Sequence, residues 1–163
     1  LIVLSGVILA AQTRNDAVNN RPVDNLNLTF LGNASLISFN YERLFFIKPA
    51  SFLAFDLGLG YNEEFQICIF GPCPPTLKYF TLPHYVTGNI GKRRHFFEFG
   101  LGGTVIVGNT AQHYLLYPIA GYRLQPLKSD RMYFRVFGQI PFVGLETIDV
   151  IFVPVGFSIG ASF

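Results

Sequence analysis

The chain has 163 residues, of which 50% are hydrophobic and 13% are charged, and its formal net charge is +2. One domain of about 100–200 residues accounts for this length, and the charged share is about half that of an ordinary soluble domain. The near-neutral balance without a dense basic stripe makes nucleic acid an unexpected partner, and no run of 18 apolar residues predicts a transmembrane helix.

The chain opens on an apolar stretch, LIVLSGVILAAQ, which has the length of a signal-peptide core and contains the small residues Ala10 and Ala11 near its end. We interpret residues 1–11 as the remnant of a secretory signal peptide processed near Gln12. The alternative is an extra N-terminal strand. Residues 12–23 are then an N-terminal segment, and residues 24–163 form the folded domain.

From residue 25 onward, apolar residues recur at every second position, which is the period of a β-strand. In SFLAFDLGLGY, residues 51–61, Phe55 and Leu57 belong to one face, whereas Asp56 and Gly58 belong to the other. Alternation of this kind predicts eight strands, at about 24–31, 35–47, 51–61, 76–90, 95–107, 114–125, 131–141 and 150–163.

Two places in this pattern need a local explanation. The apolar positions change from even to odd around GNAS, residues 32–35. Because such a change reverses every side chain, we expect a tight hairpin there. A bulge instead would leave seven strands, unless the N-terminal stretch supplied another. Pro83 interrupts the fourth strand, and since proline cannot donate to a ladder we expect a bulge at that point.

The connections between these strands are of two kinds. Longer ones alternate with short ones along the chain, so short turns gather at one end of the sheet and loops at the other. The short turns are expected at 47–50, 91–94 and 126–131, and the longer connections at 62–75, 108–113 and 142–149.

The two faces of the predicted sheet differ in composition: one is rich in phenylalanine and leucine, and the other is small, polar or charged. A soluble, lipocalin-like barrel keeps its apolar face inside, and the small residues here make a poor outer surface for it. The pattern favours an all-β, eight-stranded antiparallel up-and-down transmembrane β-barrel. Backbone groups in hydrocarbon must be paired, so the sheet must close. Side chains fill the lumen of an eight-stranded barrel, which leaves no open pore.

The last strand, VPVGFSIGASF, carries apolar residues at every second place and ends in phenylalanine. It resembles the C-terminal signal that bacterial outer-membrane barrels present to their assembly machinery. The resemblance implies that Phe157, Ile159 and Phe163 form such a signal and that the assembly machinery is a partner.

A wider resemblance covers most of the chain from residue 26 onward. The chain resembles the small outer-membrane β-barrel proteins of Bacteroidetes-type bacteria. This resemblance implies only a fold and a location in the outer membrane of a Gram-negative bacterium. It implies no activity, because such barrels mostly have none assigned. The residues that carry it are SFNYERLF (38–45), LGLGY (57–61), GKRRHFFEFGLG (91–102), GYRLQP (121–126), YFRV (133–136) and GFSIGASF (156–163).

Five charged residues fall on the small face of the sheet, and buried charges must be paired. We predict that they form a salt-bridged network that packs the lumen. The alternative is a gated proton or ion path, against which the inward tyrosines Tyr85, Tyr117 and Tyr133 argue by narrowing the lumen. The five charged residues are Glu42, Asp56, Glu98, Arg123 and Arg135.

Two cysteines lie close together in CIFGPC, on the longest loop. In an oxidising compartment we expect a disulfide between Cys68 and Cys73, which stabilises by about 2 kcal/mol on the chain-entropy model. The same loop is apolar, and we expect it either to dock on a partner protein or the outer leaflet, or to fold back over the barrel mouth. Its apolar residues are Phe65, Ile67, Ile69 and Phe70.

The one basic cluster, Lys92, Arg93 and Arg94, lies in a short turn. We interpret it either as a solvated turn or as a contact for anionic phospholipid head groups or a periplasmic partner. The three histidines are too scattered for a metal site, so neither a metal nor a cofactor is expected. His113, near Thr110 and Tyr114, is the only residue that we weigh for catalysis, and it has no serine to pair with.

Together these patterns predict an outer-membrane barrel with a structural or interaction role, without an open pore and without catalysis. Its expected partners are outer-membrane lipid and the assembly machinery. A role as accessory subunit would add other outer-membrane proteins as partners. The alternatives are an outer-membrane lipid-modifying enzyme and a soluble, lipocalin-like ligand carrier.

Overall fold

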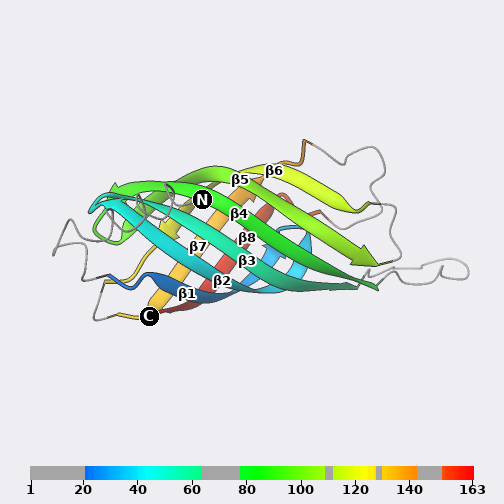
Figure 1. The fold of residues 1–163 in the computed structure, drawn as a ribbon, viewed down its shortest axis with the longest axis horizontal. Coiled ribbons are helices and arrows are strands. Elements are labelled where there is room, and N and C mark those ends of the chain that lie inside the picture. Colours follow the sequence, from blue (N-terminus) through cyan, green and yellow to red (C-terminus); the bar gives the residue numbers. More distant parts are fainter. Residues whose placement is uncertain (1–20, 64–77, 109–111, 128–129, 143–151) are drawn as a thin grey trace, which may run out of the picture.

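The structure, a computed structural model, describes residues 21–63, 78–108, 112–127, 130–142 and 152–163. Eight antiparallel strands form a closed barrel in which each strand pairs with the next, and β8 returns to pair with β1 (Figure 1). This arrangement confirms the prediction of an all-β, eight-stranded, up-and-down barrel. No helix of the described residues is long and apolar enough to cross a membrane.

Most strands end within two residues of their predicted limits. The seventh and eighth are shorter than predicted. Proline has no N–H to donate to a ladder, so β7 stops before Pro141 and β8 starts after Pro154. The strands are β1 (Asp24–Gly32), β2 (Ser35–Lys48), β3 (Ser51–Glu63), β4 (Lys78–Lys92), β5 (His95–Gly108), β6 (Tyr114–Leu124), β7 (Met132–Gln139) and β8 (Val155–Ser162).

The parity change at residues 32–35 is a tight hairpin, as predicted. Gly32 pairs with Ser35, and the two residues between them, Asn33 and Ala34, have φ values of 58° and 54°. A two-residue hairpin loop of the favoured kind requires positive φ at both central positions. The left-handed turn therefore reverses the chain and keeps β1 and β2 as separate strands.

The predicted bulge at Pro83 is wrong. Pro83 lies opposite Thr104 in the β4–β5 ladder, which runs without a shift of register. On its other side the β3–β4 ladder has no pair between Leu57–His84 and Gly60–Thr81, yet keeps its register. The missing N–H is thus accommodated by omitting pairs rather than by inserting a residue. The described irregularity lies instead in β2, between Phe46 and Lys48.

The two ends of the barrel differ. The β2–β3, β4–β5 and β6–β7 connections lie at one end, together with the start of β1 and the end of β8, and we call it the short-turn end (Figure 1, left). Asp24 and Phe163 exchange two backbone hydrogen bonds there, of 3.2 and 2.9 Å. The opposite end is the loop end. The wall is tallest along β2–β5, whose strands have 13 to 15 residues, and lowest at β7 and β8, with 8 each.

Outward side chains of the strands form an apolar belt around the barrel. Leu57 is 63% exposed and Phe97 is 73% exposed. Among the described strands, Arg43 is the one Asp, Glu, Lys or Arg that faces outward between apolar neighbours, and it pairs across the ladder with Phe55. Arg43 is ion-paired with Asp24, the first residue of β1, and a second outer pair, Lys78 with Glu63, lies at the loop end. The belt includes Leu28, Phe39, Leu53, Phe55, Leu57, Leu59, Phe80, Val86, Phe97, Phe99, Leu101, Phe134, Val136, Phe157 and Ile159.

Candidate functional site

The lumen is filled by side chains in three layers. An apolar cluster that includes Tyr117 and Phe137 occupies the loop end. A second cluster, around Phe52 and Phe96, occupies the short-turn end. The five charged residues of the predicted network lie between them, all at most 6% exposed: Glu42, Asp56, Glu98, Arg123 and Arg135.

Glu42 is the best-partnered group of this layer. Arg123 donates two hydrogen bonds to its carboxylate, at 2.8 and 2.5 Å. Asn25 donates at 2.6 Å and Tyr85 at 3.0 Å to the same two oxygens. Both charges are fully buried, and their attraction offsets the cost of removing them from water only with hydrogen bonds this complete. Glu42 thus ties β2 to β1, β4 and β6 across the lumen.

Arg135 and Glu98 form the second ion pair, with Arg135 Nε donating to Glu98 Oε2 at 2.7 Å. Glu98 Oε1 also lies 3.6 Å from Arg123 Nη2, which links the two pairs. The Arg135 guanidinium lies 4.2 Å from the centre of the Tyr85 ring and 3.9 Å from that of Phe137. Cation–π contacts of this kind stabilise a buried guanidinium on faces where it has no hydrogen-bond acceptor.

Asp56 is the unmatched acid of the layer. Its neighbours make two acid–arginine pairs, and neither carboxylate oxygen of Asp56 accepts a hydrogen bond from a described residue. Arg135 Nη1 and Nη2 likewise have no hydrogen-bond partner among the described residues. A buried carboxyl group without hydrogen-bond partners destabilises the fold, so the network carries one acid more than its packing requires.

This imbalance gives a direct prediction. Replacing Asp56 with asparagine removes the unmatched acid and keeps the shape of the side chain, so we expect the free energy of unfolding to stay at or above the wild-type value. Glu98→Gln, which removes the partner of Arg135, is the matched comparison and should destabilise. Denaturant unfolding of both variants in detergent micelles measures the two effects. A loss for Asp56→Asn as large as that for Glu98→Gln contradicts the assignment.

At the loop end, the β1–β2 turn folds into the lumen instead of standing above it. Asn33 and Ala34 are 0% and 1% exposed. The Asn33 backbone carbonyl accepts a hydrogen bond from the Thr104 hydroxyl at 2.8 Å, and the Asn33 backbone N–H donates one to Gln139 Oε1 at 3.2 Å. Asn62 donates to the Ala34 carbonyl at 2.6 Å. Side chains of β3, β5 and β7 therefore hold the turn as a cap on the lumen.

The short-turn end is sealed by aromatic rings. Phe52 and Phe96 meet edge to face, 4.9 Å between ring centres. The Arg21 guanidinium lies 5.4 Å from the centre of the Phe96 ring, and burial lowers the pKa of Arg21. Beside them, Gln125 donates to Asn25 and to Ser162, each at 3.2 Å. The chemistry of the lumen is thus that of a packed, hydrogen-bonded plug.

The remaining predicted residues are distributed as follows. Lys92 and Arg93 are exposed in the β4–β5 turn, whereas Arg94 forms an ion pair with Asp130. Phe157 and Ile159 face outward in β8, opposite Phe30 and Leu28 of β1. Phe163 is 60% exposed. Some residues that the sequence analysis singled out lie outside the described part of the chain: 1–11, Phe65, Ile67, Cys68, Ile69, Phe70, Cys73 and Thr110.

The histidines are separate in the structure. The described residues contain no group of three His, Cys, Asp or Glu side chains that would hold a metal ion. His113 is exposed, and its carbonyl accepts a hydrogen bond from the Ile106 amide. His95 lies beside Tyr122 on the outer wall.

One feature of the outer wall was missed by the sequence reasoning. His84, expected only as one of three scattered histidines, contacts Tyr114 across Gly103 in the apolar belt, toward the loop end. Its position on the apolar face of β4 was the available signal, since the alternation that points Val86 outward also points His84 outward.

Comparisons with known proteins leave the fold and this geometry as the basis for assigning a function, since the chain matches no protein-family model, no curated protein and no solved structure.

Proposed function

We propose that the protein is an integral outer-membrane β-barrel protein of a Gram-negative bacterium, with a structural or interaction role and no open pore. The observation that carries the proposal is the inverted distribution of side chains. Large apolar groups such as Leu57 and Phe97 face outward, while four fully buried charges are paired inside. In water this arrangement leaves apolar surface exposed and buries charge, whereas in a bilayer it satisfies both.

The topology supports the same proposal. The sheet closes on itself, as the pairing of backbone groups in hydrocarbon requires. The short turns lie at the same end of the barrel as the start of β1 and the end of β8. In transmembrane barrels the short turns belong to the periplasmic side. The chain's resemblance to small Bacteroidetes-type barrels is in keeping with it. On this proposal Lys92 and Arg93 stand near the inner head groups, where each basic residue adds about 1 kcal/mol of attraction to anionic lipid.

Two further roles belong to the proposal. The outward Phe157 and Ile159 of the closing strand would be presented to the assembly machinery, and loop-end residues would contact other outer-membrane proteins. Three layers of side chains fill the lumen, so conduction is not expected.

Cell fractionation tests the proposal. The full chain with an export signal, expressed in a Gram-negative host, should sediment with outer membranes and resist extraction with alkaline carbonate and urea. It should also migrate as a faster, folded species on electrophoresis unless it is boiled. Recovery of folded protein from the periplasm without detergent would contradict the proposal and favour a soluble ligand-carrying barrel.

A further inference from the structure

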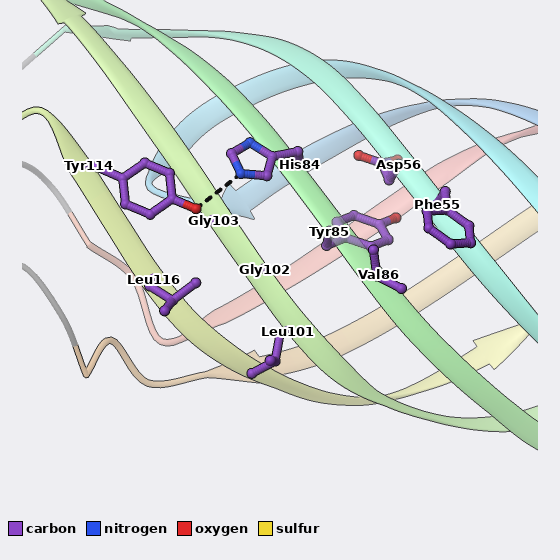
Figure 2. Close-up of a pocket in the computed structure, with 10 residues that line it drawn as sticks. All are labelled: Phe55, Asp56, His84, Tyr85, Val86, Leu101, Gly102, Gly103, Tyr114 and Leu116. Atoms are coloured by element: carbon purple, nitrogen blue, oxygen red, sulfur yellow. Dashed lines mark hydrogen bonds between the residues drawn. The ribbon is translucent and has the colours of Figure 1, made fainter. Parts of the chain in front are cut away.

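A pocket of about 260 Å³ lies in the barrel wall between β3 and β6 (Figure 2). The outward side chains of Phe55, Val86, Leu101 and Leu116 line it, so its walls are largely hydrocarbon. It lies within the apolar belt, toward the loop end. Its polar lining comes from two places: the buried, lumen-facing Asp56 and Tyr85, and one pair of outward rings, His84 and Tyr114.

A glycine makes room for this pair. The two rings stack with their centres 5.8 Å apart, and His84 Nε2 lies 3.1 Å from Tyr114 Oη. A Cβ atom on Gly103 would lie 2.0 Å from Tyr114 Oη and 2.8 Å from His84 Nε2. Any larger residue at 103 would therefore displace the hydrogen bond from its place above the strand.

The hydrogen bonds assign the protons of the pair. His84 Nδ1 lies 3.2 Å from the Leu82 carbonyl, and because a carbonyl oxygen only accepts, Nδ1 carries the proton. In the neutral imidazole, Nε2 is then the acceptor, and the Tyr114 hydroxyl donates to it. The Tyr114 oxygen keeps its acceptor lone pairs, so the pair offers an acceptor to a ligand.

The outward position of His84 among apolar side chains also costs free energy at membrane depth. Among the ionisable side chains that the described strands direct outward between apolar neighbours, Arg43 is ion-paired with Asp24, whereas the described hydrogen-bond partners of His84 are uncharged. Ionisable groups at membrane depth mark functional sites by default. At this depth the molecules that meet the wall of a membrane barrel are lipid acyl chains. The hydrocarbon lining suits an acyl chain, and the acceptor that the His84–Tyr114 pair presents on the outer surface favours a chain that can donate a hydrogen bond.

We propose that the pocket binds a lipid acyl chain that carries a hydroxyl group, and that this hydroxyl donates a hydrogen bond to Tyr114 Oη. The inference rests on the proposed membrane location. One neutral hydrogen bond favours the hydroxylated chain over the plain chain by about two- to tenfold in affinity.

Two uncharged probes of equal length test it: methyl 3-hydroxytetradecanoate and methyl tetradecanoate, added in equal amounts to the full chain purified in detergent. Native mass spectrometry gives the ratio of the two adducts, and the ¹⁵N chemical shifts of the His84 imidazole locate the bound probe. We expect the hydroxylated probe to be retained two- to tenfold more and to shift the His84 signals.

Four variants distinguish the site from general adsorption. The double variant His84→Phe, Tyr114→Phe removes both acceptors of the pair, because Tyr114→Phe alone would leave His84 Nε2 free to accept. Gly103→Ala displaces the pair, so both variants should abolish the preference. Tyr122→Phe alters the other outward His–Tyr pair, beside His95, and Gly138→Ala adds a methyl group whose nearest neighbour is 3.8 Å away. Both controls should keep the preference.

Equal binding of the two probes, or a preference that survives the double variant His84→Phe, Tyr114→Phe, overturns the inference. The double variant also decides the question if Gly103→Ala fails to fold. The membrane proposal fails separately, since it is rejected by folded protein that needs no detergent, whatever the probes do.

Discussion

Replacing Arg123 with methionine should lower the free energy of unfolding by about 3–5 kcal/mol, the usual cost of leaving one member of a buried ion pair without its partner. Arg123 donates two hydrogen bonds to Glu42, and both side chains are fully buried. Methionine leaves Glu42 charged in the lumen with only Asn25 and Tyr85 as donors. Denaturant unfolding of the barrel in lipid vesicles, followed by circular dichroism, measures the loss.

Two comparisons isolate the cause of this loss. Arg43→Met breaks the Arg43–Asp24 pair, in which the Arg43 side chain is 41% exposed, and should cost at most about 1 kcal/mol. Adding Glu42→Gln to Arg123→Met removes the stranded charge and should recover part of the stability. If Arg123→Met is no more harmful than Arg43→Met, the lumen network does not stabilise the barrel.

Arginine in place of Leu57 should destabilise the membrane-inserted barrel by about 2–4 kcal/mol, because this is the cost of Arg on the lipid face near the bilayer midplane. Leu57 is the middle residue of β3 and is 63% exposed. In a water-soluble barrel the same exposure predicts a change within about 0.5 kcal/mol. Unfolding in phosphatidylcholine vesicles therefore distinguishes a lipid environment from water by how much Leu57→Arg lowers the free energy of unfolding.

Ile47 provides the matched control for depth. It is 60% exposed but lies at the short-turn end of β2, where Arg on the lipid face costs only about 0–1 kcal/mol. Similar small losses for Leu57→Arg and Ile47→Arg would contradict a lipid environment for the belt.

The strands were predictable from the sequence because each obeys a local rule. Alternation alone placed Leu57 outward and Asp56 inward, and the change of parity at residues 32–35 placed the first hairpin. The limits of β7 and β8 were less predictable, since Pro141 and Pro154 end the ladder while apolar alternation continues past them.

The contacts of the site were less accessible, because they depend on how the sheet closes. Glu42 and Arg123 are 81 residues apart, and only the closure of the barrel brings β2 and β6 face to face across the lumen. Parity shows that five charges point inward, but not that Asp56 is left without a partner. The inward fold of Asn33 depends on left-handed backbone angles, and the room above Gly103 depends on register across β4, β5 and β6.

The central claim, that the apolar belt faces lipid, is tested most directly by fluorescence. The chain contains no tryptophan, so Leu57→Trp and Lys48→Trp each introduce a single reporter, one in mid-belt and one at the short-turn end. Both variants would be reconstituted in vesicles of phosphatidylcholine brominated on its acyl chains. We expect strong quenching of the tryptophan at 57 and weak quenching at 48. A tryptophan at 57 that brominated lipid leaves unquenched, and that aqueous acrylamide quenches instead, would contradict the account.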